Sequence, residues 1–172
     1  MKKRIIYASC FFVILIIEII IGVYIHDAFI MCLSDELFIN HNIKNMCIYF
    51  SENHLDCLCG VVKDTIENIQ KAYTIDLASN NNILHLIEKP TSVFNDWKGT
   101  GCCFMNRTML PLLEILPPNS RRNEYEMGDW IQLAIDNGFT CKIYPIASAN
   151  FNLNTQKDVV LAEAYIKENE RD

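Results

Sequence analysis

The stretch that decides the fold runs from Ile87 to Gly101: Ile87-Glu88-Lys89-Pro90, a loop, and then Gly99-Thr100-Gly101. An acid and a base sit side by side where a predicted strand ends, and Pro90 blocks further pairing because proline has no N–H to donate. The glycine pair then opens a new apolar run, Cys102-Cys103-Phe104-Met105. A charge pair at a strand end, facing a glycine that leaves room for close backbone approach, suits a small polyhydroxylated ligand.

Length, composition and charge indicate one domain that acts on small molecules. The chain has 172 residues, of which 51% are hydrophobic and 21% are charged. That length is enough for a single domain with a real core. The net charge is -6 and the pI about 5.2. Because no basic stripe is present to meet phosphates, these values argue against nucleic-acid binding and are compatible with a small-molecule enzyme.

The eight cysteines are expected to be reduced thiols that act as small hydrophobic side chains in a reducing compartment. Cys57-Leu58-Cys59 looks like half of a metal site, but no second pair follows at a usable spacing. In an extended segment, Cys57 and Cys59 point to one face. The four histidines are scattered along the chain and are expected to be surface or structural residues.

The order of apolar runs predicts an α/β domain. Ala28 to Leu33 is continuously apolar, which is typical of a strand buried on both faces, and it places Asp35 at the carboxyl end of that strand. Alternating strands and helices indicate a mainly parallel sheet. Further strands are predicted over residues 56–62, 72–78, 83–88, 101–105 and 140–146, and helices over residues 42–52, 108–116, 127–137 and 156–167.

The N-terminus is a separate problem. Lys2-Lys3-Arg4 precedes an apolar run from Ile5 to Ile25, which is long enough to cross a bilayer in spite of Glu18. Two alternatives stay open: a core helix over Val13 to Tyr24, or unrelated sequence joined to a truncated gene. The predicted organisation is therefore an apolar segment over residues 1–25, a partial catalytic domain over 26–168 and an acidic tail over 169–172.

Five motifs together resemble one enzyme family. In order, they are Phe29-Ile30-Met31-Cys32-Leu33-Ser34-Asp35, Glu88-Lys89-Pro90, Gly99-Thr100-Gly101, Glu126-Met127-Gly128-Asp129-Trp130-Ile131 and Phe151-Asn152-Leu153-Asn154-Thr155-Gln156-Lys157-Asp158. This set resembles the sugar-phosphate nucleotidyltransferases, or NDP-sugar pyrophosphorylases, from about Tyr24 to about Ile166. The resemblance implies a truncated Rossmann-like nucleotidyltransferase domain, with a mainly parallel mixed sheet flanked by helices.

The resemblance also implies a reaction and a cofactor. These enzymes transfer a nucleotidyl group from a nucleoside triphosphate to a sugar 1-phosphate, which gives an NDP-sugar and pyrophosphate with the help of Mg2+. Asp35 falls on the family's metal-binding aspartate, and Asn152 on its second metal-side residue. Asn154 is an alternative to Asn152, and both asparagines could instead shape the turn and cap the last helix. Glu36 is left out because it would point away from Asp35 if the strand continued.

Four residues fall on the family's sugar-phosphate contacts: Glu88, Lys89, Gly101 and Glu126. Lys89 would neutralise phosphate charge, and Glu88 and Glu126 would accept hydrogen bonds from sugar hydroxyl groups. The alternatives are a surface ion pair for Glu88 and Lys89 and a plain strand-start glycine for Gly101. Asp129 is expected to cap the helix that follows.

No segment of the sequence resembles the family's opening Gly-x-Gly-Thr-Arg loop, whose amides hold the triphosphate, so the catalytic residues are unknown. We expect impaired transfer by this chain, and the alternative is a non-catalytic, membrane-tethered sugar-phosphate-binding or structural remnant. The domain is expected to be cytoplasmic, with membrane association possible through residues 5–25. Self-association is also expected, because missing strands would expose the edge of the strand over Phe29 to Leu33.

Overall fold

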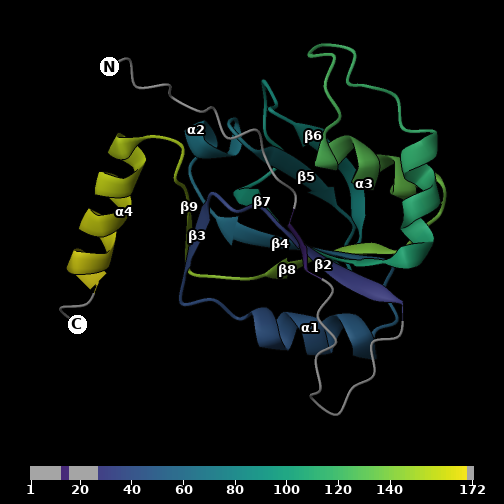
Figure 1. Ribbon diagram of the computed structural model, residues 1–172, viewed down its shortest axis with the longest axis horizontal. Helices are drawn as coiled ribbons and strands as arrows, with labels where there is room; N and C mark the ends of the chain where they lie inside the picture. The colour runs from purple at the N-terminus through teal and green to yellow at the C-terminus, as the bar shows by residue number, and fades with distance from the viewer. Residues whose placement is uncertain (1–12, 16–26, 170–172) are drawn as a thin grey trace, which may run out of the picture.

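The computed structural model describes residues 13–15 and 27–169. Its centre is a sheet in the order β1-β2-β7-β4-β8, flanked by two smaller strand pairs, β3 with β9 and β5 with β6 (Figure 1). In chain order the strands are β1 Val13–Leu15, β2 Ala28–Cys32, β3 Glu36–Ile39, β4 Cys57–Lys63, β5 Tyr73–Leu77, β6 Ile83–Glu88, β7 Trp97–Asn106, β8 Cys141–Pro145 and β9 Ala149–Asn152.

Strand directions in the central sheet are mixed. β4 pairs with β8 in parallel, whereas β7 pairs antiparallel with both β2 and β4. β2, β4 and β8 therefore run in one direction, and β7 lies between β2 and β4 in the opposite direction. The α/β class and the mixed sheet are confirmed. Within the central sheet, only β4 and β8 pair in parallel as expected. β7 lies between β2 and β4 and runs in the opposite direction, so its pairs with both strands are antiparallel.

Helices and the small hairpin cover the two faces of this sheet (Figure 1). On one face lies α1, and on the other lie the β5/β6 hairpin, the 3-10 helix η1 and α3. α4 lies apart from the central sheet and contacts β9 through Phe151 and Tyr165, whose ring centroids are 5.3 Å apart. The helices are α1 Ile43–Glu52, α2 Ile66–Ile69, η1 Arg107–Glu114, α3 Met127–Asp136 and α4 Gln156–Asn169.

Both faces of the sheet are buried, which explains the continuous apolar runs. Alternate residues of each strand enter opposite cores, so that Phe104 packs with Phe50 of α1 while Met105 packs with Trp130 of α3. The side chains of Cys57 and Cys59 share the second face, with their sulfur atoms 3.7 Å apart. The seven cysteines of the described part of the chain are free thiols.

Several elements differ from the sequence expectations. The helix expected over residues 108–116 is η1, which has 3-10 geometry around Pro111, a residue that cannot donate to an α-helical ladder. β7 begins at Trp97, so Gly101 lies inside the strand instead of at its start. β3, β9 and α2 were not expected.

Most of the predicted apolar segment, Ile5 to Ile25, lies outside the described residues. Within it, β1 pairs antiparallel with β2, with Val13 opposite Cys32. The core-helix alternative is therefore wrong for these three residues, and the β2 edge that was expected to be exposed is paired here. Among the described residues, no helix has the length and apolar character needed to cross a membrane.

Candidate functional site

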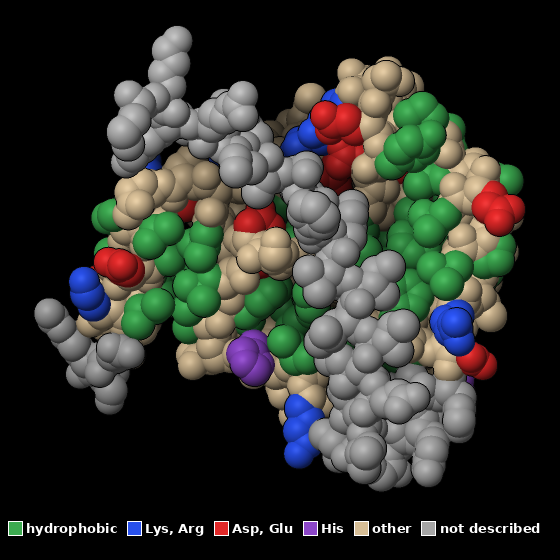
Figure 2. All heavy atoms as spheres, viewed as in Figure 1, with side chains coloured by type: hydrophobic (Ala, Val, Ile, Leu, Met, Phe, Trp, Pro, Cys, Tyr) green, Lys and Arg blue, Asp and Glu red, His purple; other side chains and the backbone are tan. Residues whose placement is uncertain are grey.

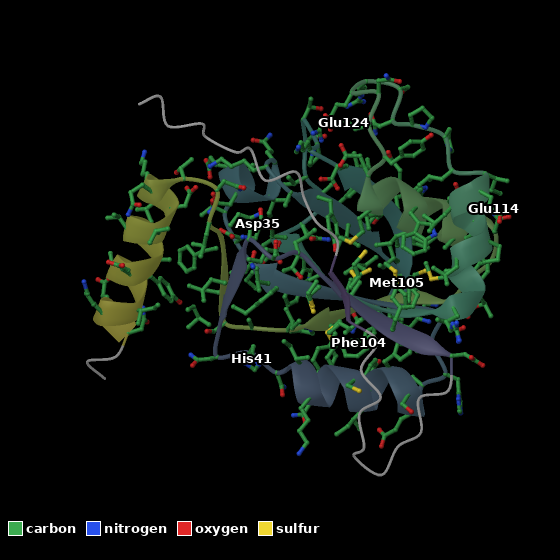
Figure 3. The ribbon with its side chains drawn as sticks, in the orientation of Figure 1. Asp35, His41, Phe104, Met105, Glu114 and Glu124 are labelled. Atoms are coloured by element: carbon green, nitrogen blue, oxygen red, sulfur yellow. The ribbon has the colours of Figure 1, made fainter. Side chains whose placement is uncertain are left out.

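Polar residues collect where β2 ends and the chain enters the β3/β9 pair. β2 stops at Cys32, a turn follows, and Asp35 precedes β3. β3 pairs with β9 so that Glu36 lies opposite Asn152, and the Leu153 N–H donates to the Asp35 carbonyl oxygen at 2.7 Å. Figure 3 shows Asp35 at this edge, between the central sheet and the β3/β9 pair. The structure thus brings together the segments of the two expected metal ligands, Asp35 and Asn152.

Glu36 lies inside this edge. Its two carboxylate oxygens accept the Gly101 N–H at 2.9 and 3.0 Å. The pKa of Glu36 is raised to about 7, chiefly by burial and to a lesser extent by the charge of Asp35, while the Gly101 N–H and Lys98 act to lower it. The assumption that Glu36 points away is wrong because β2 does not continue through it. The Ser34-Asp35 pair, two common turn residues, was the signal for this.

Gly101 makes close contacts on both sides of its backbone. Its carbonyl oxygen accepts the Leu33 N–H at 3.1 Å, while its N–H is taken by Glu36. A Cβ atom at position 101 would lie 2.3 Å from the Leu33 Cγ. The room that glycine leaves is therefore filled by Leu33, and neither backbone group of Gly101 is free for a ligand in this conformation.

A buried ion pair adjoins Glu36. The Lys98 Nζ lies 2.6 Å from the Asp64 carboxylate and donates to the Asn150 carbonyl oxygen at 3.0 Å. Burial acts to raise the pKa of Asp64, but hydrogen bonds from Lys98 and Asn68 outweigh it and hold that pKa below its usual range. The pair joins the end of β4 to β7 and to β9.

Glu88 and Glu126 form the second part of the site. Glu88 ends β6, and Glu126 directly precedes α3 and forms an ion pair with Arg122. The pKa of Glu88 is raised to about 7, first by burial and then by the charge of Glu126. Lys89 and Arg122 partly oppose this. The two carboxylates expected to contact a sugar are therefore close enough to interact.

Tyr73 connects this second part to β7. Tyr73 lies opposite Glu88 in the hairpin, and its hydroxyl donates to the Thr100 carbonyl oxygen at 3.0 Å. Its ring lies against Gly99, where a Cβ atom would overlap it at 1.8 Å. Glu88 is thereby held beside the same stretch of β7 that carries Gly101.

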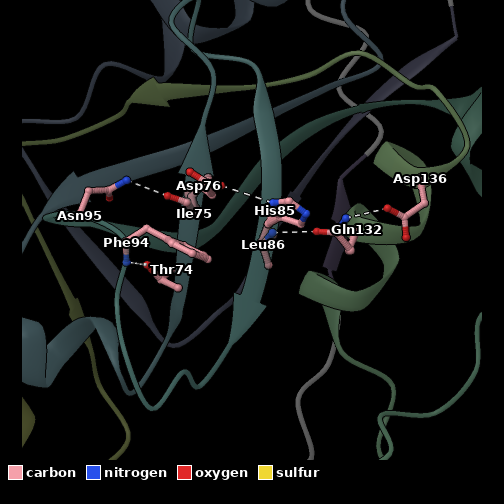
Figure 4. Close-up of polar contacts among 9 residues, drawn as sticks. All are labelled: Thr74, Ile75, Asp76, His85, Leu86, Phe94, Asn95, Gln132 and Asp136. Carbon is pink, nitrogen blue, oxygen red and sulfur yellow. Dashed lines mark hydrogen bonds and ion pairs between the residues drawn. The ribbon is translucent and has the colours of Figure 1, made fainter.

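The start of α3 is fixed against β6. A hydrogen bond from the Leu86 N–H to the Gln132 Oε1 atom, 2.7 Å long, joins the helix to the hairpin (Figure 4). A Cβ atom on Gly128 would lie 2.9 Å from the Glu88 carboxylate, so the helix approaches the strand closely there. Gly128 is a site-shaping residue to which the sequence interpretation gave no role.

The expectation that Asp129 caps α3 is wrong. Asp129 lies in the first turn of the helix and accepts a hydrogen bond from the Asn119 side chain at 2.8 Å.

Lys89, which was expected to contact phosphate, is exposed. Its backbone φ angle is 42°, and its N–H donates to the Ala72 carbonyl oxygen at 2.7 Å. Acidic and basic side chains gather near the loop that carries Glu124, before α3 (Figures 2 and 3).

The donor set has a clear metal preference. Asp35 and Asn152 offer carboxylate and amide oxygens, which are the hard ligands that Mg2+ takes. No group of three or more histidine, cysteine, aspartate or glutamate side chains in the described part of the chain could enclose a metal ion.

Comparisons with known proteins agree with the fold. No family model matches the chain. Over 71 residues it is 25% identical to the bifunctional protein GlmU of Thermodesulfovibrio yellowstonii, a match that covers 40% of this chain and 16% of that protein.

Solved structures match over most of the chain. A putative glucose-1-phosphate thymidylyltransferase from Bacillus anthracis, in complex with sucrose, matches with a TM-score of 0.68 at 17% identity over 81% of this chain and 54% of that one. A UDP-glucose pyrophosphorylase complexed with UDP-glucose matches with a TM-score of 0.70 at 18% identity, over 86% and 58%. A UTP-bound UDP-glucose pyrophosphorylase from Acinetobacter baumannii matches at 0.68 and 16%, over 81% and 50%. The chain therefore has the fold of the sugar-phosphate nucleotidyltransferases and spans about half the length of these structures, which confirms the sequence resemblance at the level of the fold.

Proposed function

We propose that this chain carries the sugar-phosphate side of a nucleotidyl-transfer site. The observation that supports this best is the junction of Asp35 with the β9 segment, through the 2.7 Å hydrogen bond from the Leu153 N–H. This bond joins the chain segments that carry Asp35 and Asn152, and the solved structures with this fold include a UDP-glucose complex, which supports the proposal. The reaction class is transfer of a nucleotidyl group from a nucleoside triphosphate to a sugar 1-phosphate.

Each residue has a task in this proposal. Glu88 and Glu126 accept hydrogen bonds from sugar hydroxyl groups, and the exposed Lys89 approaches the sugar phosphate. Asp35 and Asn152 would hold Mg2+. Bound there, Mg2+ would neutralise phosphate charge while a phosphate oxygen of the sugar attacks the α-phosphorus and pyrophosphate leaves. Asn152 brings no charge, so we expect weaker metal binding than two carboxylates would give.

A direct assay tests the proposal. The chain is incubated with Mg2+, a panel of nucleoside triphosphates and a panel of hexose 1-phosphates, and pyrophosphate release and sugar-nucleotide binding are both measured. Release that depends on the sugar 1-phosphate, or saturable binding of a sugar nucleotide, supports the proposed site. The absence of both release and binding over the whole panel contradicts it.

Binding without transfer is the second candidate. The same assay separates the two: calorimetric binding of a sugar nucleotide with no pyrophosphate release supports a binding protein. Glu88→Gln is the site variant, because it removes the charge and one acceptor at similar volume. Glu163→Gln, on the exposed side of α4, is the matched control.

A further inference from the structure

The Glu36 side chain accepts the hydrogen bond of a β7 N–H group at the point where the neighbouring strand β2 turns away from β7. β2 and β7 are antiparallel, and their register places Leu33 opposite Gly101. Such a pair can form two backbone hydrogen bonds, but only the bond from the Leu33 N–H to the Gly101 carbonyl oxygen is present. The Gly101 N–H faces the same side, where the chain has already turned away. The Glu36 carboxylate takes that N–H with both oxygens.

Asn150 faces the same spot with an unsatisfied side chain. Glu36 lies opposite Asn152, so Asn150, two residues away on β9, shares the face of Glu36. Asn150 is only 5% exposed and lies close enough to the Glu36 carboxylate to act to lower its pKa, but neither its side-chain nitrogen nor its side-chain oxygen makes a well-formed hydrogen bond within the described part of the chain. A buried amide without partners is costly, and it indicates a place where a ligand or water supplies the missing bonds.

We propose that the Glu36 carboxylate occupies, in the free protein, the place of a ligand hydroxyl group on the Gly101 N–H, and that it moves aside when a sugar binds. A hydroxyl group both donates and accepts, so one group can take the Gly101 N–H and satisfy Asn150 at once. This inference rests on the proposed function, because Gly101 is a sugar contact only there. Glu36 is then the residue that sets the affinity of this subsite.

The Glu36→Ala variant tests this competition. Removal of the Glu36 side chain frees the Gly101 N–H for a ligand. In Glu36→Ala the Gly101 N–H has no acceptor in the free protein, whereas a bound ligand supplies one. The free-energy cost of the unsatisfied N–H is therefore removed on binding, and the ligand binds more tightly.

The test compares Glu36→Ala, Glu36→Gln and the exposed control Glu67→Ala by calorimetry, with a panel of hexose 1-phosphates and their UDP derivatives. We expect Glu36→Ala to bind about tenfold more tightly than the unaltered protein, because an unsatisfied buried N–H costs about 1–3 kcal/mol and tenfold corresponds to about 1.4 kcal/mol. The amide oxygen of Glu36→Gln still accepts from Gly101, so its gain should be smaller. Glu67→Ala should bind as the unaltered protein does.

Each outcome decides one point. A purely structural role for Glu36 predicts weaker or unchanged binding in Glu36→Ala, and that result would overturn the inference while the proposed function stands. If the unaltered protein and all variants bind nothing in the panel, the proposed function fails, and the inference fails with it.

A second measurement needs no variant. In the unaltered protein, a nuclear Overhauser contact between the Gly101 N–H and the Glu36 side chain should be present without ligand and lost at saturation with a sugar nucleotide. Persistence of that contact in the saturated complex would overturn the inference even if Glu36→Ala does not fold.

Discussion

Loss of the Lys98 ammonium group should destabilise the fold far more than loss of a surface lysine. Lys98 is 5% exposed, and its Nζ lies 2.6 Å from the Asp64 carboxylate. In Lys98→Met the carboxylate stays in place without its cation, and removal of one partner from a buried pair costs roughly 3–5 kcal/mol. Asp64 keeps hydrogen bonds from the Thr65 N–H and the Asn68 side chain, both at 2.8 Å, which favours the lower end of that range.

Urea unfolding at neutral pH, followed by tryptophan fluorescence, measures this loss. The matched control is Lys63→Met, because Lys63 pairs with Asp96 at the surface and both side chains are more than half exposed. That pair should be worth at most about 1 kcal/mol. The double variant Lys98→Met, Asp64→Leu should recover part of the loss, since it leaves no unpaired charge.

The pH dependence supplies an independent check. The pKa of Asp64 is lowered in the folded protein, so its pair with Lys98 stabilises the fold above the ordinary aspartate pKa of 3.8, and this contribution is lost as the pH falls through the folded value. The difference between the unaltered protein and Lys98→Met should therefore shrink in acid. A Lys98→Met variant that loses no more stability than Lys63→Met, or a difference that stays constant into acid, would refute the reasoning.

Three further predictions concern other parts of the structure. The unaltered protein should lose stability between pH 4.5 and about 7, because burial raises the pKa of Glu88 in the folded state and its ionisation then destabilises the fold. In Glu88→Gln this loss of unfolding free energy should be smaller by roughly 1–3 kcal/mol. Urea unfolding at a series of pH values that gives both proteins the same loss would contradict this. Oxidised glutathione should link Cys32 to Cys102, because these residues lie directly opposite each other with their sulfur atoms 3.3 Å apart. One thiolate attacks glutathione disulfide to form a mixed disulfide, the second thiolate then closes the protein disulfide, and two glutathione thiols are released. Peptide mapping that finds both cysteines as free thiols would argue against this strand register. Gly99→Ala should lower the melting temperature much more than Gly138→Ala does. The methyl group at position 99 would overlap the Tyr73 ring, whereas the one at position 138 costs only about 1–2 kcal/mol, because the backbone φ angle there is 84°. Similar losses for the two variants in calorimetry would count against the packing of the β5/β6 hairpin on β7.

Elements with a strong local pattern could be predicted from the sequence. Ile43, Met46, Cys47 and Phe50 have helical spacing, and α1 begins and ends within a residue of the prediction. The polar cluster over residues 79–82 separates two strand-like runs, and these form the β5/β6 hairpin. The run over Ala28 to Leu33 is buried on both faces, as a continuously apolar strand requires.

Short elements without a pattern could not be predicted. β3 and β9 have four residues each and lie too far apart in the chain for any local signal to pair them. Their pairing decides where Glu36 points, and the role of Glu36 was missed for that reason. Lys98 was missed because residues 91–98 look like a loop, whereas they lead into β7 and bury a lysine whose partner, Asp64, is distant in the sequence.

The motif residues were chosen by resemblance, and the structure shows how far they assemble. The β3/β9 pairing brings the segments of Asp35 and Asn152 together, although it is Glu36 that lies opposite Asn152. Glu88 at the end of β6 and Glu126 before α3 are close enough for the charge of one to affect the pKa of the other. Tyr73 lies opposite Glu88 and packs its ring and hydroxyl group on Gly99 and Thr100 of β7, an arrangement that no spacing in the sequence encodes.

Backbone amide NMR during titration with a sugar nucleotide and Mg2+ tests the central claim most directly, since it reports every part of the candidate site in one experiment. The largest shift changes should fall together on residues 33–36, 88–89, 99–101, 126–128 and 150–153, and they should saturate at one common ligand concentration. No saturable change, or changes centred on α1 or α4 instead, would contradict the assignment of one sugar-phosphate site at this edge of the sheet.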